Sequence, residues 1–252
     1  MKFLQSIFVC SVLFTLGNCA ELFQSSKNKN NNDALFAALL AGPGCGPTAV
    51  SGAAGNGTRY NFTGCSGDAT AVLRGLGFTA NGVSFNAGIQ GTSNSSTIVT
   101  NASSLSETGT DSKAGIEVVY VMNQTESRID AMIHATPSLD GPGVRLSHTF
   151  AQWLNGNTAS AFVTKPGAPW ASSVAVEKTV CLEVHKETGG GHIFGWSLPC
   201  NSIADRSVYE FDQEDASITS FSGDRVGFRI NNAVIKSVTI YSAKLGLAEM
   251  LR

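Results

Sequence analysis

The sequence predicts an all-β domain, folded as an antiparallel sandwich or barrel and preceded by one short N-terminal helix. Strand-forming runs alternate with turn clusters from about Val83 onward, and no window beyond the N-terminal ones shows a helical period. A chain of 252 residues with 27 glycines and 14% charged residues is typical of a turn-rich β protein. The expected strands are Val83–Ile89, Ser96–Thr100, Gly115–Met122, Arg128–Ala135, Val144–Phe150, Ser160–Thr164, Val174–Lys186, His192–Leu198, Val208–Phe211, Arg225–Asn231 and Val234–Ser242.

The first twenty residues have the pattern of an export signal. Lys2 is followed by an apolar run, too short to span a bilayer, that ends in Leu16-Gly17-Asn18-Cys19. This tetrapeptide resembles a bacterial lipobox in the relaxed form of spirochaetal lipoproteins. The resemblance implies a signal peptide over residues 1–18 and acyl chains such as palmitate on Cys19, which would anchor the protein in a membrane at the outer membrane or cell surface. Ordinary secretion after cleavage at Ala20 is the alternative.

The next segments are predicted to connect this anchor to a single domain. Residues 19–32 should form a flexible tether, because Ser25–Asn32 is polar, low in complexity and has nothing to bury. A short helix capped by Asp33 follows, and residues 33–67 as a whole are predicted to be this helix and an irregular cap held by a disulfide. The sandwich itself is expected over residues 68–245.

Four cysteines remain once Cys19 is assigned to the lipid. They are Cys45, Cys65, Cys181 and Cys200, and an even number in an exported chain implies two disulfides, with three pairings open. Pairing of sequence neighbours closes two loops of similar size, each worth about 3 kcal/mol in the chain-entropy model. We therefore expect Cys45 with Cys65 and Cys181 with Cys200.

The segment Thr179–Asn201 has the pattern of a β-hairpin. Folding it about Gly190-Gly191 leaves eight residues in each arm and places Cys181 opposite Cys200. The two glycines suit a primed turn, which needs positive φ at both central positions. The sequence thus predicts a hairpin with a disulfide across its open end.

The same register argues against a metal site in this hairpin. His185 would face Trp196, and His192 would lie four positions further along, about 13 Å away at the rise of a strand. Two ligands of one ion cannot be so far apart, although both residues are of a ligand type. We therefore expect His185 to stack on Trp196 or to stand at a solvated strand edge.

The C-terminal segment resembles a known family of sandwiches. Within Gly223–Tyr241, a strand reading Gly-Asp-Arg-Val-Gly-Phe-Arg is followed by an Asn-rich turn and a strand ending in Val-Thr-Ile-Tyr. This is similar to the closing hairpin of concanavalin-like (laminin G-like) jelly rolls. The resemblance implies a jelly-roll fold, and a surface that binds glycans or proteins or, in some members, cleaves polysaccharides. The fold alone does not choose among these functions.

An acidic triplet gives the enzyme hypothesis its residues. Glu210, Asp212 and Glu214 would share one face of a strand. They resemble the Glu-x-Asp-x-Glu signature of retaining β-glucanases, which implies a nucleophile, its electrostatic partner and an acid/base in that order. Gln213 departs from that signature, which has an apolar residue there. A solvated edge is the alternative, as is a calcium site made by Asp212, Glu214 and Asp215, since calcium prefers oxygen ligands.

Exposed aromatic side chains are the remaining candidates for ligand binding. Trp170, in a proline-rich loop, and Trp196 could stack on sugar rings, with His185 beside the latter. The net charge of −2 gives no nucleic-acid footprint. We interpret the chain as an exported, lipid-anchored module that binds a glycan or protein without a cofactor other than calcium, and more as a binder than an enzyme. A jelly-roll glycosidase and a structural envelope lipoprotein are the alternatives.

Overall fold

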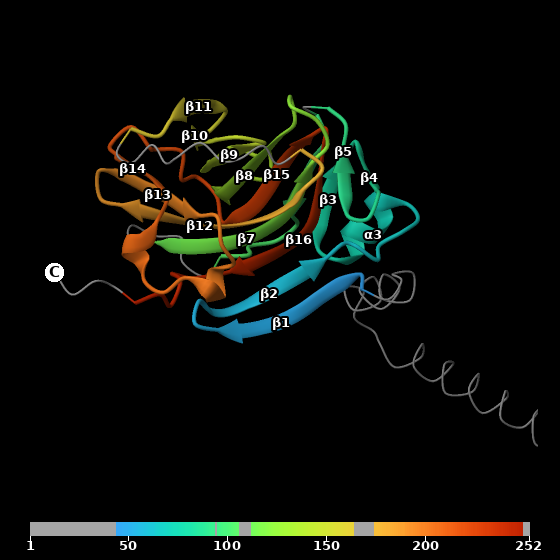
Figure 1. Cartoon of the computed structure of the whole chain (residues 1–252), viewed down its shortest axis with the longest axis horizontal. Coiled ribbons are helices and arrows are strands. Elements are labelled where there is room, and N and C mark those ends of the chain that lie inside the picture. The colour runs from blue at the N-terminus through green and yellow to red at the C-terminus, as the bar shows by residue number, and fades with distance from the viewer. Residues whose placement is uncertain (1–43, 94, 106–111, 164–173, 249–252) are drawn as a thin grey trace, which may run out of the picture.

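The computed structural model describes residues 44–93, 95–105, 112–163 and 174–248 (Figure 1). The predicted signal peptide, Cys19, the tether, the first helix and Trp170 lie outside these residues. Within the described ranges, no helix combines the length and the apolar character needed to cross a membrane.

Two antiparallel sheets make up the described part of the chain. The larger sheet has the order β1-β2-β16-β7-β12-β13-β14, with β4 and β5 attached beside β16, and the smaller has the order β11-β10-β9-β8-β15-β6-β3. The larger sheet contains β1 (Gly46–Gly52), β2 (Gly55–Asn61), β4 (Val83–Phe85), β5 (Ile89–Gly91), β7 (Lys113–Met122), β12 (Glu177–Glu187), β13 (Gly190–Trp196), β14 (Phe211–Asp215) and β16 (Ala233–Tyr241). The smaller sheet contains β3 (Phe78–Asn81), β6 (Thr97–Thr100), β8 (Arg128–Ala135), β9 (Pro142–Ser147), β10 (Ala151–Asn155), β11 (Thr158–Ala161) and β15 (Arg225–Asn231).

The chain passes between the two sheets several times, which makes the fold a jelly-roll sandwich. It leaves the larger sheet after β7, returns at β12, crosses again to β15 and ends in β16 (Figure 1). Alternate residues of these strands fill the core, as with Ile116 and Val118 of β7 against Ile129 and Ala131 of β8. The predicted fold class, an all-β antiparallel sandwich, is confirmed.

The N-terminal part of the sandwich corrects two expectations. Residues 46–61 form the regular hairpin β1–β2, and β2 pairs with β16, so this segment belongs to the larger sheet and is not an irregular cap. The sequence showed no helix after it, yet α3 (Ala69–Gly75) is helical. Asp68 caps α3 by accepting a hydrogen bond from the Ala71 amide at 2.9 Å, and Val72 and Leu73 are buried.

Both disulfides join sequence neighbours, as predicted. Cys45 is bonded to Cys65, where the disulfide holds the start of β1 near the end of β2, and Cys181 is bonded to Cys200. The position of the second disulfide differs from the expectation. Cys200 lies in the 3-10 helix η1 (Cys200–Ser202), which folds over the outer face of the sheet, and Cys181 is paired in the ladder with Trp196.

The turn of the β12–β13 hairpin is therefore not at Gly190-Gly191. Glu187 pairs with Gly190, and the two-residue turn is Thr188-Gly189, with φ of +93° at Gly189. A side chain on Gly190 would collide with the backbone of Asp215, and one on Gly191 with the ring of Phe221. These two glycines permit close packing on β14 and the segment after it, and the turn forms two residues earlier than predicted.

Candidate functional site

The corrected register brings the two histidines of the hairpin side by side. His185 of β12 is paired with His192 of β13, and their ring centroids lie 5.7 Å apart. The expected distance of about 13 Å, and the argument against a metal site that rested on it, are therefore wrong. The side chains lie on the outer face of the larger sheet, because Val184 and Ile193, which point the other way, are in the core.

A buried carboxylate holds the His185 ring. His185 Nε2 is hydrogen-bonded to Glu183 Oε1, and Arg206 donates to both carboxylate oxygens of Glu183, at 3.1 and 3.0 Å. Burial alone would raise the pKa of the Glu183 carboxyl, but the hydrogen bonds and charges of His185 and Arg206 together lower its pKa. Glu183 is therefore an anion that accepts from both partners.

Glu183 and Arg206 also fasten the C-terminal segment over this face. The Leu245 amide donates to Glu183 at 2.9 Å, and Arg206 donates to the Leu245 carbonyl at 2.8 Å. Together with η1 and η2 (Arg206–Val208), this segment covers Phe194 and the Cys181–Cys200 disulfide. The cover makes the surroundings of the His185 ring largely dry, and only 7% of its side chain is exposed.

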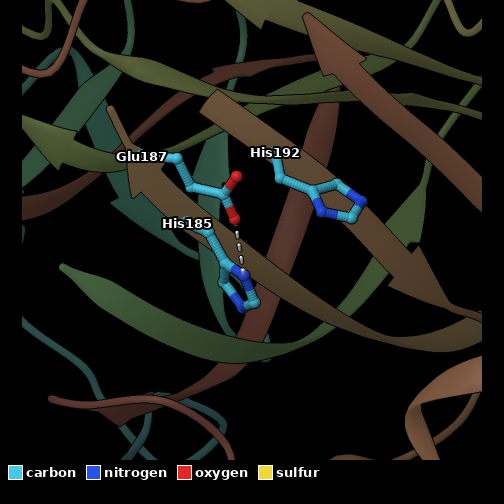
Figure 2. Close-up of side chains that lie close together, drawn as sticks. All are labelled: His185, Glu187 and His192. Atoms are coloured by element: carbon cyan, nitrogen blue, oxygen red, sulfur yellow. Dashed lines mark ion pairs between the residues drawn. The ribbon is translucent and has the colours of Figure 1, made fainter. Parts of the chain in front are cut away.

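A second carboxylate holds the His192 ring. His192 Nε2 is hydrogen-bonded to Asp212 of the neighbouring strand β14, which is buried. Glu187 follows His185 on the same face of β12, and its carboxylate lies 3.7 Å from His185 Nδ1. Figure 2 shows the Glu187 carboxylate beside the two imidazole rings, and each of the three side chains offers a ligand atom within 4.8 Å of the others. We call His185, Glu187 and His192 the histidine cluster.

A cavity of about 300 Å³ opens next to the histidine cluster at the tip of the hairpin. Three acidic residues, Glu187, Glu214 and Asp215, line it together with Thr188–Gly191 and Ala216. Gly189 has open space where a side chain would be, whereas Gly190 and Gly191 are packed against Asp215 and Phe221. The cavity therefore presents many hydrogen-bonding groups and little apolar surface.

The predicted catalytic triplet lies on this same outer face but does not line that cavity as a set. Glu210 accepts hydrogen bonds from the amide and hydroxyl of Ser197, at 3.1 and 2.7 Å, and Asp212 is engaged by His192. Of the three, only Glu214 borders the cavity. The geometry thus gives these residues structural partners and does not form a groove with paired carboxylates.

The structure also does not assemble the predicted calcium ligands. Side chains alternate along a strand, so Asp215 is on the opposite face of β14 from Asp212 and Glu214, and it accepts a hydrogen bond from the Ser217 amide at 2.7 Å. Among the described residues, the acidic and histidine side chains whose ligand atoms converge are those of the histidine cluster.

The predicted aromatic platform at Trp196 is wrong. The residue is 1% exposed, and its ring packs edge-on against Phe194 with centroids 5.1 Å apart. His185 does not stack on Trp196, and its ring contacts Phe194 and His192. Of the predicted ligand-binding candidates, His185 is the one that the described structure places in the site.

Sequence reasoning missed the roles of His192, Glu187 and Arg206. The alternation His185-Lys-Glu187 was visible and places both side chains on one face of a strand. The position of the turn brings His192 beside them. Arg206 reaches Glu183, 23 positions away in the sequence, because the segment after β13 folds over the sheet.

Comparisons with known proteins identify no family. No protein-family model matches the chain, and no curated protein matches it. Among solved structures, it is similar to the carbohydrate-binding module CBM66 from Bacillus subtilis (16% identity, TM-score 0.37, covering 67% of this chain and 93% of that one). It is also similar to the metal-free carbohydrate recognition domain of Emp46p (12%, 0.40, 73% and 94%) and to the apo Crh5 transglycosylase (13%, 0.41, 79% and 92%). Likeness at this level supports no statement about ligand or activity.

Proposed function

We propose that the protein is an exported, lipid-anchored surface module that binds a glycan in the cavity at the tip of the β12–β13 hairpin. The observation that supports this most directly is the lining of that cavity by Glu187, Glu214, Asp215 and the residues of the hairpin turn, Thr188 and Gly189. Its volume of about 300 Å³ is at the lower end of the range for small-ligand pockets.

The chemistry of the lining favours a polyhydroxylated ligand. Carboxylates accept hydrogen bonds from neighbouring hydroxyl groups, and such charge-assisted hydrogen bonds are the strong ones. The peptide groups of Thr188 and Gly189, which lie outside the ladder of the hairpin, can also donate and accept hydrogen bonds. A strongly anionic ligand would be repelled by three carboxylates, and an apolar one would find little surface to cover.

Export has separate support. The two disulfides are of the kind that form and persist in oxidising compartments outside the cytosol. The lipobox-like Leu16-Gly17-Asn18-Cys19 supplies the proposed anchor. A tether of residues 19–32 would hold the sandwich away from the bilayer with its glycan site accessible.

Glycan binding is tested by screening the full-length protein, in detergent and with its disulfides intact, on an array of glycans in the presence of a chelator and again with zinc. We expect selective binding, and we expect Glu214→Gln to weaken it roughly tenfold or more, because one charge-assisted hydrogen bond is lost. Glu214 is exposed, so this variant should fold normally.

The matched control is Glu126→Gln, which removes an exposed carboxylate from the turn between β7 and β8. His185 pairs with Lys113 at the start of β7, whereas this turn follows Met122 at the other end of the strand. Equal affinity of the wild type and Glu214→Gln, or the absence of any bound glycan, contradicts the proposal.

The anchor is tested by the intact mass of the protein extracted from membranes. The expected N-terminus is Cys19 with added acyl mass, and reduction should release four alkylatable cysteines. An N-terminus at Glu21 without lipid would show that the protein is secreted unanchored.

A further inference from the structure

We infer that His185, Glu187 and His192 bind one divalent transition-metal ion, with zinc as the best match. The inference goes beyond the proposed glycan binding and stands on the geometry of the histidine cluster, whether or not a glycan binds. Three features support it: the tautomers of the rings, the spacing of the ligand atoms, and the room for a further ligand.

The carboxylates behind the two rings set their tautomers. Glu183 and Asp212 each engage the Nε2 atom of one ring, His185 and His192 respectively. An ionised carboxylate can only accept, so Nε2 of each ring carries the proton. In a neutral imidazole the lone pair is then on Nδ1. Histidines that bind metals through one nitrogen have the other held in this way by a carboxylate.

The lone pairs then converge with an anionic oxygen. His185 Nδ1 lies 3.7 Å from a Glu187 oxygen, which is too long for a hydrogen bond. Figure 2 shows the His192 ring beside the same carboxylate, and the three ligand atoms, one from each residue, lie within 4.8 Å of one another. When both rings are neutral, their two lone pairs and the carboxylate repel one another, and a cation between them removes that repulsion.

The spacing suits a small tetrahedral ion after a modest closure. Zinc binds nitrogen and oxygen ligands at about 2.0–2.2 Å, so two of its ligand atoms lie about 3.4 Å apart. Glu187 can close the difference by a change of rotamer, because its side chain is 37% exposed, while hydrogen bonds to Glu183 and Asp212 hold the two rings. Two imidazoles and one carboxylate favour zinc, nickel or copper over calcium, which prefers oxygen ligands.

A three-ligand site leaves one tetrahedral position open. Glu187 belongs to the histidine cluster and also lines the 300 Å³ cavity, so the metal site adjoins that cavity. A water molecule or a hydroxyl group of a ligand in the cavity would complete the coordination. The site is thus built to hold an ion in contact with whatever enters the cavity.

The test is titration of the chelator-treated full-length protein with zinc chloride, followed by calorimetry, and with cobalt(II), followed by its visible absorption. We expect one zinc per chain and cobalt bands typical of four nitrogen and oxygen ligands. Each of Glu187→Gln, His185→Gln and His192→Gln should weaken zinc binding roughly tenfold or more. Zinc should also raise the Tm of the wild type more than that of Glu187→Gln.

His148→Gln is the matched control, because it removes a histidine that belongs to another part of the sandwich, after β9. It should change the zinc affinity less than twofold. Glu187→Gln keeps the test decisive if a buried histidine variant does not fold, since Glu187 is partly exposed. The absence of stoichiometric zinc binding, or binding that survives Glu187→Gln unchanged, overturns the inference. Neither result depends on whether a glycan binds.

Discussion

Both outer faces of the sandwich bury carboxylates, but the two faces give them different partners. On the smaller sheet, Asp130 accepts two hydrogen bonds from Arg145, at 2.6 and 2.9 Å, and Arg229 lies 3.6 Å away. On the larger sheet, Asp212 is engaged by His192 and Glu183 by His185. Arginine is always protonated, whereas histidine can be neutral and can offer a lone pair.

The difference shows how similar carboxylates acquire different roles. Asp130 accepts two hydrogen bonds from one guanidinium group and lies close to a second, and an arginine has no lone pair to offer a metal ion. His185 donates Nε2–H to Glu183, and its Nδ1 then faces a Glu187 oxygen 3.7 Å away. Glu183 combines both roles, because it neutralises Arg206 and orients His185.

The largest loss of stability is expected for Glu183→Gln, because Glu183 is bonded to both an arginine and a histidine. The variant leaves the largely buried Arg206 without its anion, so the free energy of unfolding should fall by about 4 kcal/mol. Urea titration measures the loss. The control Glu177→Gln, in an exposed pair with Lys236, should cost less than about 1 kcal/mol. A loss as small for Glu183→Gln would contradict the assigned role.

His134 is a further buried histidine, and 1% of the residue is exposed. Burial, with the nearby charge of Lys186, lowers the pKa of His134 to about 4. The unfolded chain binds this proton at about pH 6.5, so the protein should lose stability as the pH falls from about 6.5 to about 4, by roughly 3 kcal/mol.

Urea titrations at several pH values, on the wild type and on His134→Asn, measure this contribution. Asparagine tolerates the positive φ of +60° at this position. The slope of stability against pH between 6.5 and 4.5 should be smaller in the variant. Parallel curves would show that His134 does not carry the effect.

Asp130→Asn tests the carboxylate of the smaller sheet, which is bound by arginine. Loss of the charge weakens the hydrogen bonds from Arg145, and we expect a loss of about 2 kcal/mol in urea titrations. Zinc and glycan binding should not change. Asp224→Asn, in an exposed pair with Arg225 at 3.8 Å, is the control and should have almost no effect. Weaker zinc binding in Asp130→Asn would mean that the two faces are coupled.

The smallest effect on stability, about 1 kcal/mol, is expected for Asp212→Asn. The amide oxygen still accepts from His192 Nε2, so the ring keeps its orientation and only the charge is lost. Zinc affinity should fall roughly tenfold, with the cobalt spectrum unchanged in shape. If Asp212 only packs β14 against β13, stability will fall while zinc affinity stays the same.

The sequence predicted the fold where the pattern is local. Arg128–Ala135 and Arg225–Asn231 were predicted with the bounds that the structure has, because period-two alternation needs only neighbouring residues. The helix α3 was missed because seven residues give too few turns for a periodic signal. Its one local sign was Asp68, a residue typical of the start of a helix.

The candidate site depended on information that the local pattern lacks. Thr188-Gly189-Gly190-Gly191 allows more than one two-residue turn, and the choice rests on packing against Asp215 and Phe221, more than twenty residues away. The error moved the partner of His185 by four positions and left every side chain on its predicted face. The right residue types were therefore identified on the right face, but with the wrong neighbours.

The most direct test of the account is nitrogen NMR of the imidazole rings of His185 and His192, without metal and with zinc. We expect Nε2 of each ring to carry the proton of its hydrogen bond to the carboxylate, and zinc to shift both Nδ1 resonances together at one equivalent. Nδ1–H tautomers, or Nδ1 resonances that zinc leaves unmoved, would contradict the claim that Glu183 and Asp212 orient these rings toward a shared ion.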